Sequence, residues 1–87
     1  MKQNQRILNH LIDHGWITQV VASNYNIRRC ASRICELKEA GIKINTEIRF
    51  DDAGVRYAYY YITPFVRKVE RNRRDRGLPY HKVKKAA

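Results

Sequence analysis

The side chains with the clearest chemical potential lie close together between residues 28 and 36. Three arginines fall within six positions there, and a serine and a glutamate lie beside them at helical spacing. An arginine can donate two parallel hydrogen bonds to O6 and N7 of guanine, and a serine can contact a base edge or a phosphate. A glutamate can accept from the amino group of cytosine or orient a neighbouring arginine. We predict base and phosphate contacts from this cluster, with a merely solvated helix face as the alternative. Its members are Arg28, Arg29, Ser32, Arg33 and Glu36.

The overall charge also favours a polyanionic partner. Eighteen Lys and Arg residues against eight Asp and Glu give +10, and residues 64–87 alone hold nine basic and two acidic side chains. Nucleic acid is the first candidate for such a surplus, followed by an anionic membrane and an acidic protein, although a solubilising tail would have the same composition. We predict phosphate contacts from a basic C-terminal helix. The residues concerned are Arg67, Lys68, Arg71, Arg73, Arg74 and Arg76.

That helix has a small apolar face formed by Phe65, Val66 and Val69. Three residues are too few for firm binding to a membrane surface, so we expect no membrane partner. The same three side chains leave two other arrangements open. They can dock the helix onto the rest of the chain, or they can form a seam between two copies.

The spacing of the candidate residues argues against a metal site and against a catalytic site. His10 and His14 stand four residues apart on a helix, which is a zinc-binding spacing, and Cys30 and Cys35 are further conceivable ligands. However, we expect His10 to face away from the core and Cys30 to face into it. The two cysteines would also point about 140° apart on one helix, so they cannot bridge each other. No phosphate loop or nucleophile motif is present, and we predict a non-enzymatic chain without metal or cofactor.

The elements that position the arginines are predicted from periodicity and punctuation. A helix over residues 4–14 carries an apolar stripe, and Thr18 is an N-cap for a second helix that reaches about residue 24. Asn26 tolerates the left-handed backbone of a tight turn, so we place a sharp corner there. A third helix is predicted over residues 27–40. Its core stripe is Ile27, Cys30, Ala31, Ile34 and Leu37.

From residue 42 onward the pattern changes to period two. Ile42, Ile44, Ile48 and Phe50 form the apolar side of one predicted strand, the turn follows at residues 51–54, and residues 55–62 form a tyrosine-rich second strand. We predict that basic side chains of this hairpin reach phosphates, whereas its acidic turn does not insert deeply. Solubilising charges on an edge strand are the alternative. The candidates are Lys43, Arg49 and Arg56.

The predicted order of elements is helix, a strand stub at Trp16-Ile17, helix, tight turn, helix and hairpin. This is the order of a winged helix-turn-helix, in which a tight turn holds one helix so that it can enter the major groove. The predicted fold class is therefore α+β, with three helices and a β-hairpin wing, then a short basic C-terminal helix and tail. We assign residues 1–63 to the winged-helix domain, 64–77 to the basic helix and 78–87 to a flexible basic tail.

Several of these segments also resemble a known family. The runs at residues 17–22, 25–34 and 54–60, with Leu37 and Gly41 between them, look like a family of small phage and prophage helix-turn-helix proteins. The resemblance covers about residues 5–62 and implies a winged-helix fold and DNA binding. Two positions depart from the family pattern: Asn26 stands where glycine is usual, and Cys30 where leucine is commoner.

We accordingly predict sequence-specific binding to double-stranded DNA by a phage or prophage transcriptional regulator. An excisionase-like or architectural factor that bends DNA is one alternative. Another is a protein-interaction module that inhibits a nucleic-acid machine of the host, and RNA binding is a third. A homodimer and a host protein partner are left open. The N-terminal residues lead into a helix rather than a signal peptide, so we expect a cytoplasmic location in the bacterial host cell, in association with the nucleoid.

Overall fold

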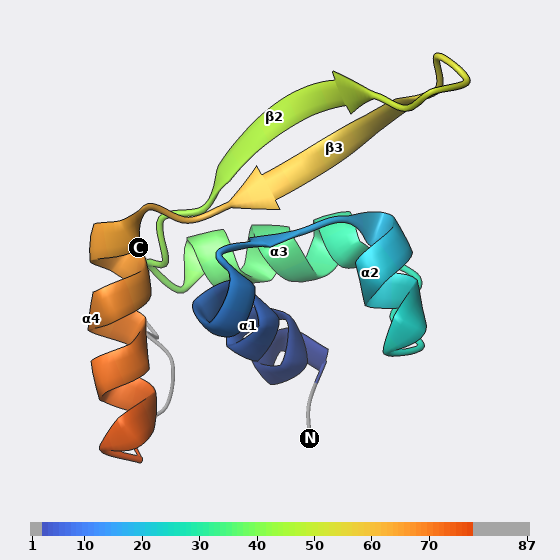
Figure 1. Cartoon of the computed structure of the whole chain (residues 1–87). Coiled ribbons are helices and arrows are strands. Elements are labelled where there is room, and N and C mark those ends of the chain that lie inside the picture. Colours follow the sequence, from blue (N-terminus) through green and yellow to red (C-terminus); the bar gives the residue numbers. More distant parts are fainter. Residues whose placement is uncertain (1–2, 78–87) are drawn as a thin grey trace.

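The computed structural model describes residues 3–77 and contains the predicted succession of elements (Figure 1). Helices and strands form one α+β unit with a three-stranded antiparallel sheet, which confirms the predicted fold class. The tail predicted over residues 78–87 lies outside the described residues. The elements are α1 Gln3–His14, β1 Trp16–Ile17, α2 Gln19–Asn24, α3 Cys30–Glu39, β2 Asn45–Phe50, β3 Arg56–Tyr61 and α4 Pro64–Asp75.

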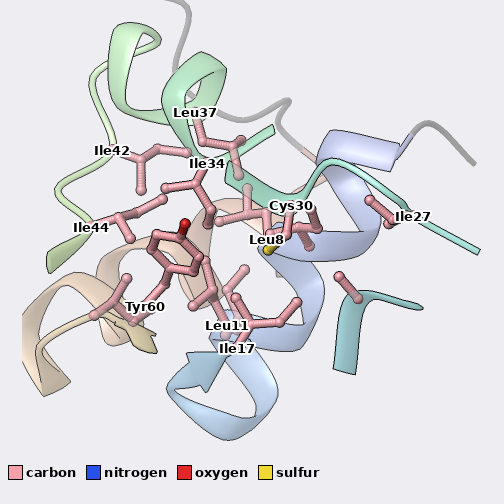
Figure 2. Close-up of a cluster of buried hydrophobic side chains, with 14 residues drawn as sticks. Leu8, Leu11, Ile17, Ile27, Cys30, Ile34, Leu37, Ile42, Ile44 and Tyr60 are labelled. Carbon is pink, nitrogen blue, oxygen red and sulfur yellow. The ribbon is translucent and has the colours of Figure 1, made fainter. Parts of the chain in front are cut away.

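The core lies between α1, α3 and the base of the hairpin (Figure 2). The apolar stripe of α1 is buried along its whole length, and it packs against Cys30, Ile34 and Leu37 of α3. Tyr60 enters the same cluster from β3. Each buried aliphatic side chain contributes about 1.5–3 kcal/mol relative to its exposed state, so this shared core fixes α3 on its supporting helix.

The turn between α2 and α3 has the predicted conformation. The hydroxyl of Thr18 accepts from the backbone N–H of Val21 at 3.5 Å and caps α2. Asn26 has a φ of 62°, and it is the one residue other than glycine with a positive φ among the described residues. Asparagine pays a smaller penalty than most side chains in this left-handed region. The corner therefore forms with Asn26 in place of the glycine usual in the resembling family.

The third helix begins later than predicted. Residues 27–29 precede α3, which starts at Cys30, so Arg28 and Arg29 belong to the turn and not to the helix. Ile27 is nevertheless fully buried in the core cluster, and its backbone N–H donates to the Ala22 carbonyl at 3.0 Å. Ala31, predicted as core, is exposed. One helical stripe cannot include both it and the buried Leu37, since the two lie about 120° apart around the axis.

The sheet has the order β1-β3-β2, and β2 is an edge strand. Ile42 and Ile44 are buried as predicted, but they precede β2, which begins at Asn45. Ile48 and Phe50, also predicted on the apolar side, are 44% and 66% exposed, because the hairpin extends away from the body and nothing among the described residues covers its far half (Figure 1).

Helix α4 begins at the predicted cap, where the Thr63 hydroxyl accepts from Val66 N–H at 3.3 Å and Pro64 occupies the first turn. It packs against α1, and Val66 contacts the main core. Phe65 is 74% exposed, so the three apolar residues of α4 do not act as one docking face. No helix within the described part of the chain is long and apolar enough to cross a membrane.

Candidate nucleic-acid interface

The turn that leads into α3 presents two arginines to solvent. Arg28 and Arg29 are both exposed, and Arg29 occupies the N-cap position without a side-chain capping bond. With Arg33 they line a shallow hollow of about 250 Å³ beside Asn26. No acidic side chain among residues 3–77 forms an ion pair with Arg28 or Arg29. Both guanidinium groups are therefore available to an external anion at the amino end of α3.

Gln19 fixes the position of that amino end. Its Oε1 accepts from the backbone N–H of Cys30 at 3.0 Å, and its Nε2 donates to the carbonyl of Ile27 at 2.9 Å. One side chain of α2 thus caps α3 and ties the intervening turn, in place of the local cap that Arg29 does not supply. This role of Gln19 was not predicted from the sequence. Glutamine is an unusual N-cap residue, and its two partners lie eight and eleven positions farther along the chain.

Two of the charged side chains predicted to contact DNA from α3 are paired with each other. Arg33 Nε lies 2.7 Å from Glu36 Oε1, so these two side chains form an ion pair one turn apart. Glu36 is thereby placed to orient Arg33, which is one of the two roles considered for it. Ser32 is half-buried, and Ala31 and Cys35 are exposed beside it. Small uncharged side chains therefore lie beside the Arg33–Glu36 ion pair, which suits close approach to base edges.

An aromatic stack holds Arg49 on the outer face of the hairpin. Trp16 and Tyr59 are stacked with ring centroids 5.6 Å apart, and the guanidinium of Arg49 lies 3.7 Å from the centre of the Tyr59 ring. Arg49 Nε also donates to Glu47 at 3.3 Å, and this hydrogen bond raises the pKa of Arg49 further. Arg49 is therefore oriented but partly neutralised. Arg56 and Lys43, the other predicted hairpin contacts, are exposed.

The acidic turn of the hairpin uses one of its carboxylates internally. Asp51 Oδ1 accepts from the backbone N–H of Ala53 at 2.9 Å and of Val55 at 2.8 Å. Gly54 has a φ of 78°, which this tight turn requires. These bonds explain the residue types at 51–54 by turn chemistry. The second carboxylate, Asp52, is exposed at the tip.

Three of the predicted C-terminal arginines are turned toward the end of α1. Arg67 donates to the carbonyls of Ile12 and Asp13 at 2.5 Å each, and Arg71 donates to the Ile12 carbonyl at 3.2 Å. Arg74 forms an ion pair with the Asp13 carboxylate at 3.0 Å. Arg67 and Arg71 thereby satisfy backbone acceptors that a helix end leaves unpaired. Of the other candidates on α4, Lys68 and Arg76 are exposed, and Arg73 is half-buried.

His10 and His14 lie in a cluster of aromatic rings. His10 Nδ1 lies 2.8 Å from the Tyr25 hydroxyl, and the rings of His10 and His14 are 4.4 Å apart. Burial, and secondarily the neighbouring His14, lowers the pKa of His10. Within residues 3–77 no three His, Cys, Asp or Glu side chains converge on one point. The cysteines do not bridge: Cys30 is buried and Cys35 exposed.

Comparison with known proteins gives one match. A family model described as a winged helix-turn-helix domain matches residues 2–64, which covers α1 to the end of β3 and stops where α4 begins. No curated protein and no solved structure matches the chain. The helix-turn-helix unit is a DNA-binding module in which the second of its two helices reads the major groove. The matched segment thus contains Gln19 with its hydrogen bonds to residues 27 and 30, the turn with Arg28 and Arg29, and the hairpin.

Proposed function

This chain belongs to the winged helix-turn-helix domain family, and on that premise we propose that it binds double-stranded DNA sequence-specifically as a transcriptional regulator. The observation that carries the proposal is the amino end of α3, where Arg28 and Arg29 are exposed and have no ion-pair partner within residues 3–77, while Gln19 binds the backbone of residues 27 and 30 behind them. In this arrangement α3 enters the major groove with its amino end leading.

The chemistry at that end of α3 suits a nucleic acid. A helix amino terminus carries a partial positive charge, and its first backbone N–H groups favour phosphate oxygens. Arg28 and Arg29 add two full charges at the same place, and Arg33 lies beside them with its guanidinium oriented by Glu36. Ser32 and Cys35 lie farther along the helix, where small side chains permit close contact with base edges.

The hairpin supplies a second contact region. Arg56 and Lys43 are exposed, and Arg49 is held over Tyr59. A contact from a wing of this kind fixes the orientation of a protein on the duplex without reading sequence directly. The exposed side chains of α4, Lys68 and Arg76, are suited to the same role. We assign less to Arg67, because its hydrogen bonds are directed into the chain.

A regulatory role in a phage or prophage rests on the resemblance described above. Selection from a random duplex pool tests it most directly. A discrete enriched motif, palindromic or not, supports sequence-specific regulation. Equal retention of all sequences together with a measurable bend would instead support an architectural factor.

Affinity measurements with matched variants test the geometry. We expect Arg29→Ala to weaken binding to the selected duplex by about 1–3 kcal/mol, whereas Arg6→Ala, which removes the same charge from the exposed surface of α1, changes it little. The logarithm of the wild-type binding constant should fall with the logarithm of salt concentration, by about 0.9 per phosphate contact. A flat salt response, or equal affinity for single strands and RNA, would overturn the proposal.

A further inference from the structure

Strand β2 leaves one side of the sheet open. The sheet order β1-β3-β2 places it at the edge, and all six of its residues are exposed. Figure 1 shows the hairpin extending away from the helices, and no helix or strand of residues 3–77 lies along the outer side of β2. An edge of this kind presents a row of unpaired backbone N–H and C=O groups, which is a template for another strand.

The backbone groups that face the open edge follow from the register. Asp51 N–H donates to the Val55 carbonyl at 3.0 Å, so residues 51 and 55 form a hydrogen-bonded pair. Such pairs alternate with non-hydrogen-bonded pairs along an antiparallel ladder, and Ile48 lies opposite Ala58. Residues 49, 47 and 45 therefore bond to β3. The groups directed outward belong to Thr46, Ile48 and Phe50.

We propose that this edge pairs antiparallel with β2 of a second copy of the chain, with Ile48 opposite Ile48 across a two-fold axis. This register brings all three outward-facing residues into hydrogen-bonded pairs, Ile48 with itself and Thr46 with Phe50 in both directions. Three pairs that each exchange two bonds give about six backbone hydrogen bonds. The proposal does not depend on the function proposed above.

The charges on β2 select this register among those that the backbone permits. In it, Glu47 of each copy lies opposite Arg49 of the other on the outer face, so the two opposite charges meet twice. A shift of two residues in one direction sets Glu47 against Glu47, and in the other direction Arg49 against Arg49. Like charges directly opposite destabilise a strand pair. Glu47 and Arg49 already attract each other within one chain, at 3.3 Å.

The apolar side chains on the inner face point to the same partner. Phe50 and Ile48 are 66% and 44% exposed and lie on the side of the hairpin that faces α3, as the bond from Lys38 Nζ to Thr46 Oγ1 at 3.2 Å shows. In the proposed register Phe50 comes to lie beside Thr46 of the second copy, over the aliphatic part of Lys38. Ile48 meets its own equivalent at the axis. Both apolar groups then lose contact with water.

The two-fold axis runs perpendicular to the joined sheet. Both inner faces, and hence both α3 helices, then lie on one side of it. A dimer of this form presents its two recognition helices to the same face of a duplex, and such symmetry corresponds to a palindromic target.

A charge-exchange experiment on the full chain tests the register. The association of the wild type is measured by sedimentation equilibrium in the absence of DNA, in about 0.15 M salt, where the overall positive charge is screened more than adjacent pairs are. We expect Glu47→Arg and Arg49→Glu, each alone, to weaken self-association by at least about tenfold, because each sets like charges opposite in two places. A one-to-one mixture of the two variants should associate, since every opposite pair is then attractive.

The mixture separates the interface from effects within one chain. In both single variants residues 47 and 49 repel each other inside the chain, and mixing does not change that repulsion. Recovery in the mixture therefore reports contacts between copies. Failure of the mixture to associate, or a wild type that stays monomeric into the millimolar range, would overturn the proposal. A monomeric wild type whose duplex binding is weakened by Phe50→Ala would assign the apolar patch to DNA instead.

Discussion

The hydrogen bonds of Gln19 make a prediction that can be worked through quantitatively. This side chain accepts from Cys30 N–H at 3.0 Å and donates to the Ile27 carbonyl at 2.9 Å. Both partner residues have side chains that are almost fully buried, so protein surrounds the turn on one side. Replacement by alanine removes both bonds at once. It leaves a donor and an acceptor that water reaches only in part.

The expected cost follows from those two backbone groups. An unsatisfied buried donor or acceptor costs about 1–3 kcal/mol, and partial access of water places each group toward the lower end of this range. We therefore expect Gln19→Ala to reduce the free energy of unfolding by about 2–3 kcal/mol. In a domain of this size that loss lowers the melting temperature by about 10–20 °C. The hydrogen bond from Gln19 Nε2 to Ser23 Oγ at 3.1 Å is exposed and adds little.

Urea denaturation followed by circular dichroism measures this effect, with Gln5→Ala as the matched control. Gln5 is also a helical glutamine, and it donates to the Asn9 side chain at 2.9 Å four residues away on α1. Because that bond joins two side chains on one helix, we expect its loss to cost about 0.5 kcal/mol or less. Equal destabilisation by the two variants would refute the stabilising role of the two Gln19 hydrogen bonds to the backbone. A Gln19→Ala chain that keeps its stability and its duplex affinity would do so as well.

Three further predictions concern the end of α1, the thiols and His10. Arg67→Ala should lower the free energy of unfolding by about 1–2 kcal/mol, because it removes two hydrogen bonds to carbonyls at the end of α1, of which only that of Ile12 keeps a bond from Arg71, whereas Lys68→Ala, at an exposed neighbour, should change it by less than about 0.5 kcal/mol in the same urea titration. Burial raises the pKa of the Cys30 thiol to about 11, so Ellman's reagent should modify Cys35 rapidly and Cys30 only on unfolding; two equally fast thiols would contradict this. Because the folded state lowers the pKa of His10, the unfolded chain binds the proton more tightly, and stability should fall as the pH drops below about 6.5. His10→Gln should flatten that dependence, and an unchanged pH profile would exclude His10 as its source.

Local rules in the sequence were sufficient for much of the fold. The stripe of α1, the Thr18 and Thr63 caps and the corner at Asn26 each depend on residues within a few positions of one another. The hairpin turn at residues 51–54 belongs to the same class, since Asp51 binds the backbone two and four residues ahead. Features of this kind depend on contacts between neighbouring residues, so periodicity and side-chain chemistry predict them.

Features that depend on distant partners were not predictable in the same way. The first turn of α3 was expected from Ile27, because the apolar spacing continues back to that residue. The helix instead begins at Cys30, where Gln19 from the preceding helix takes up its first N–H. The exposure of Ile48 and Phe50 is a second case. Alternation predicts which side chains share a face of a strand, but not how far the body of the protein extends beneath it.

The arginines show the same limit and bear directly on function. As types, Arg29 and Arg67 are indistinguishable in the sequence, and both were predicted to contact DNA. In the structure Arg67 is bound to two carbonyls of α1, 55 and 54 positions away in the chain, while Arg29 has no such acceptor within residues 3–77. Hydrogen bonding does not remove the charge of Arg67, so it still adds to the long-range field that attracts a polyanion. It does engage Nε and Nη2 and turn the guanidinium toward α1, away from the position that close contact with a phosphate or a guanine requires. Binding strength at low salt should therefore draw on all the arginines, whereas discrimination between sequences should depend on the few beside α3.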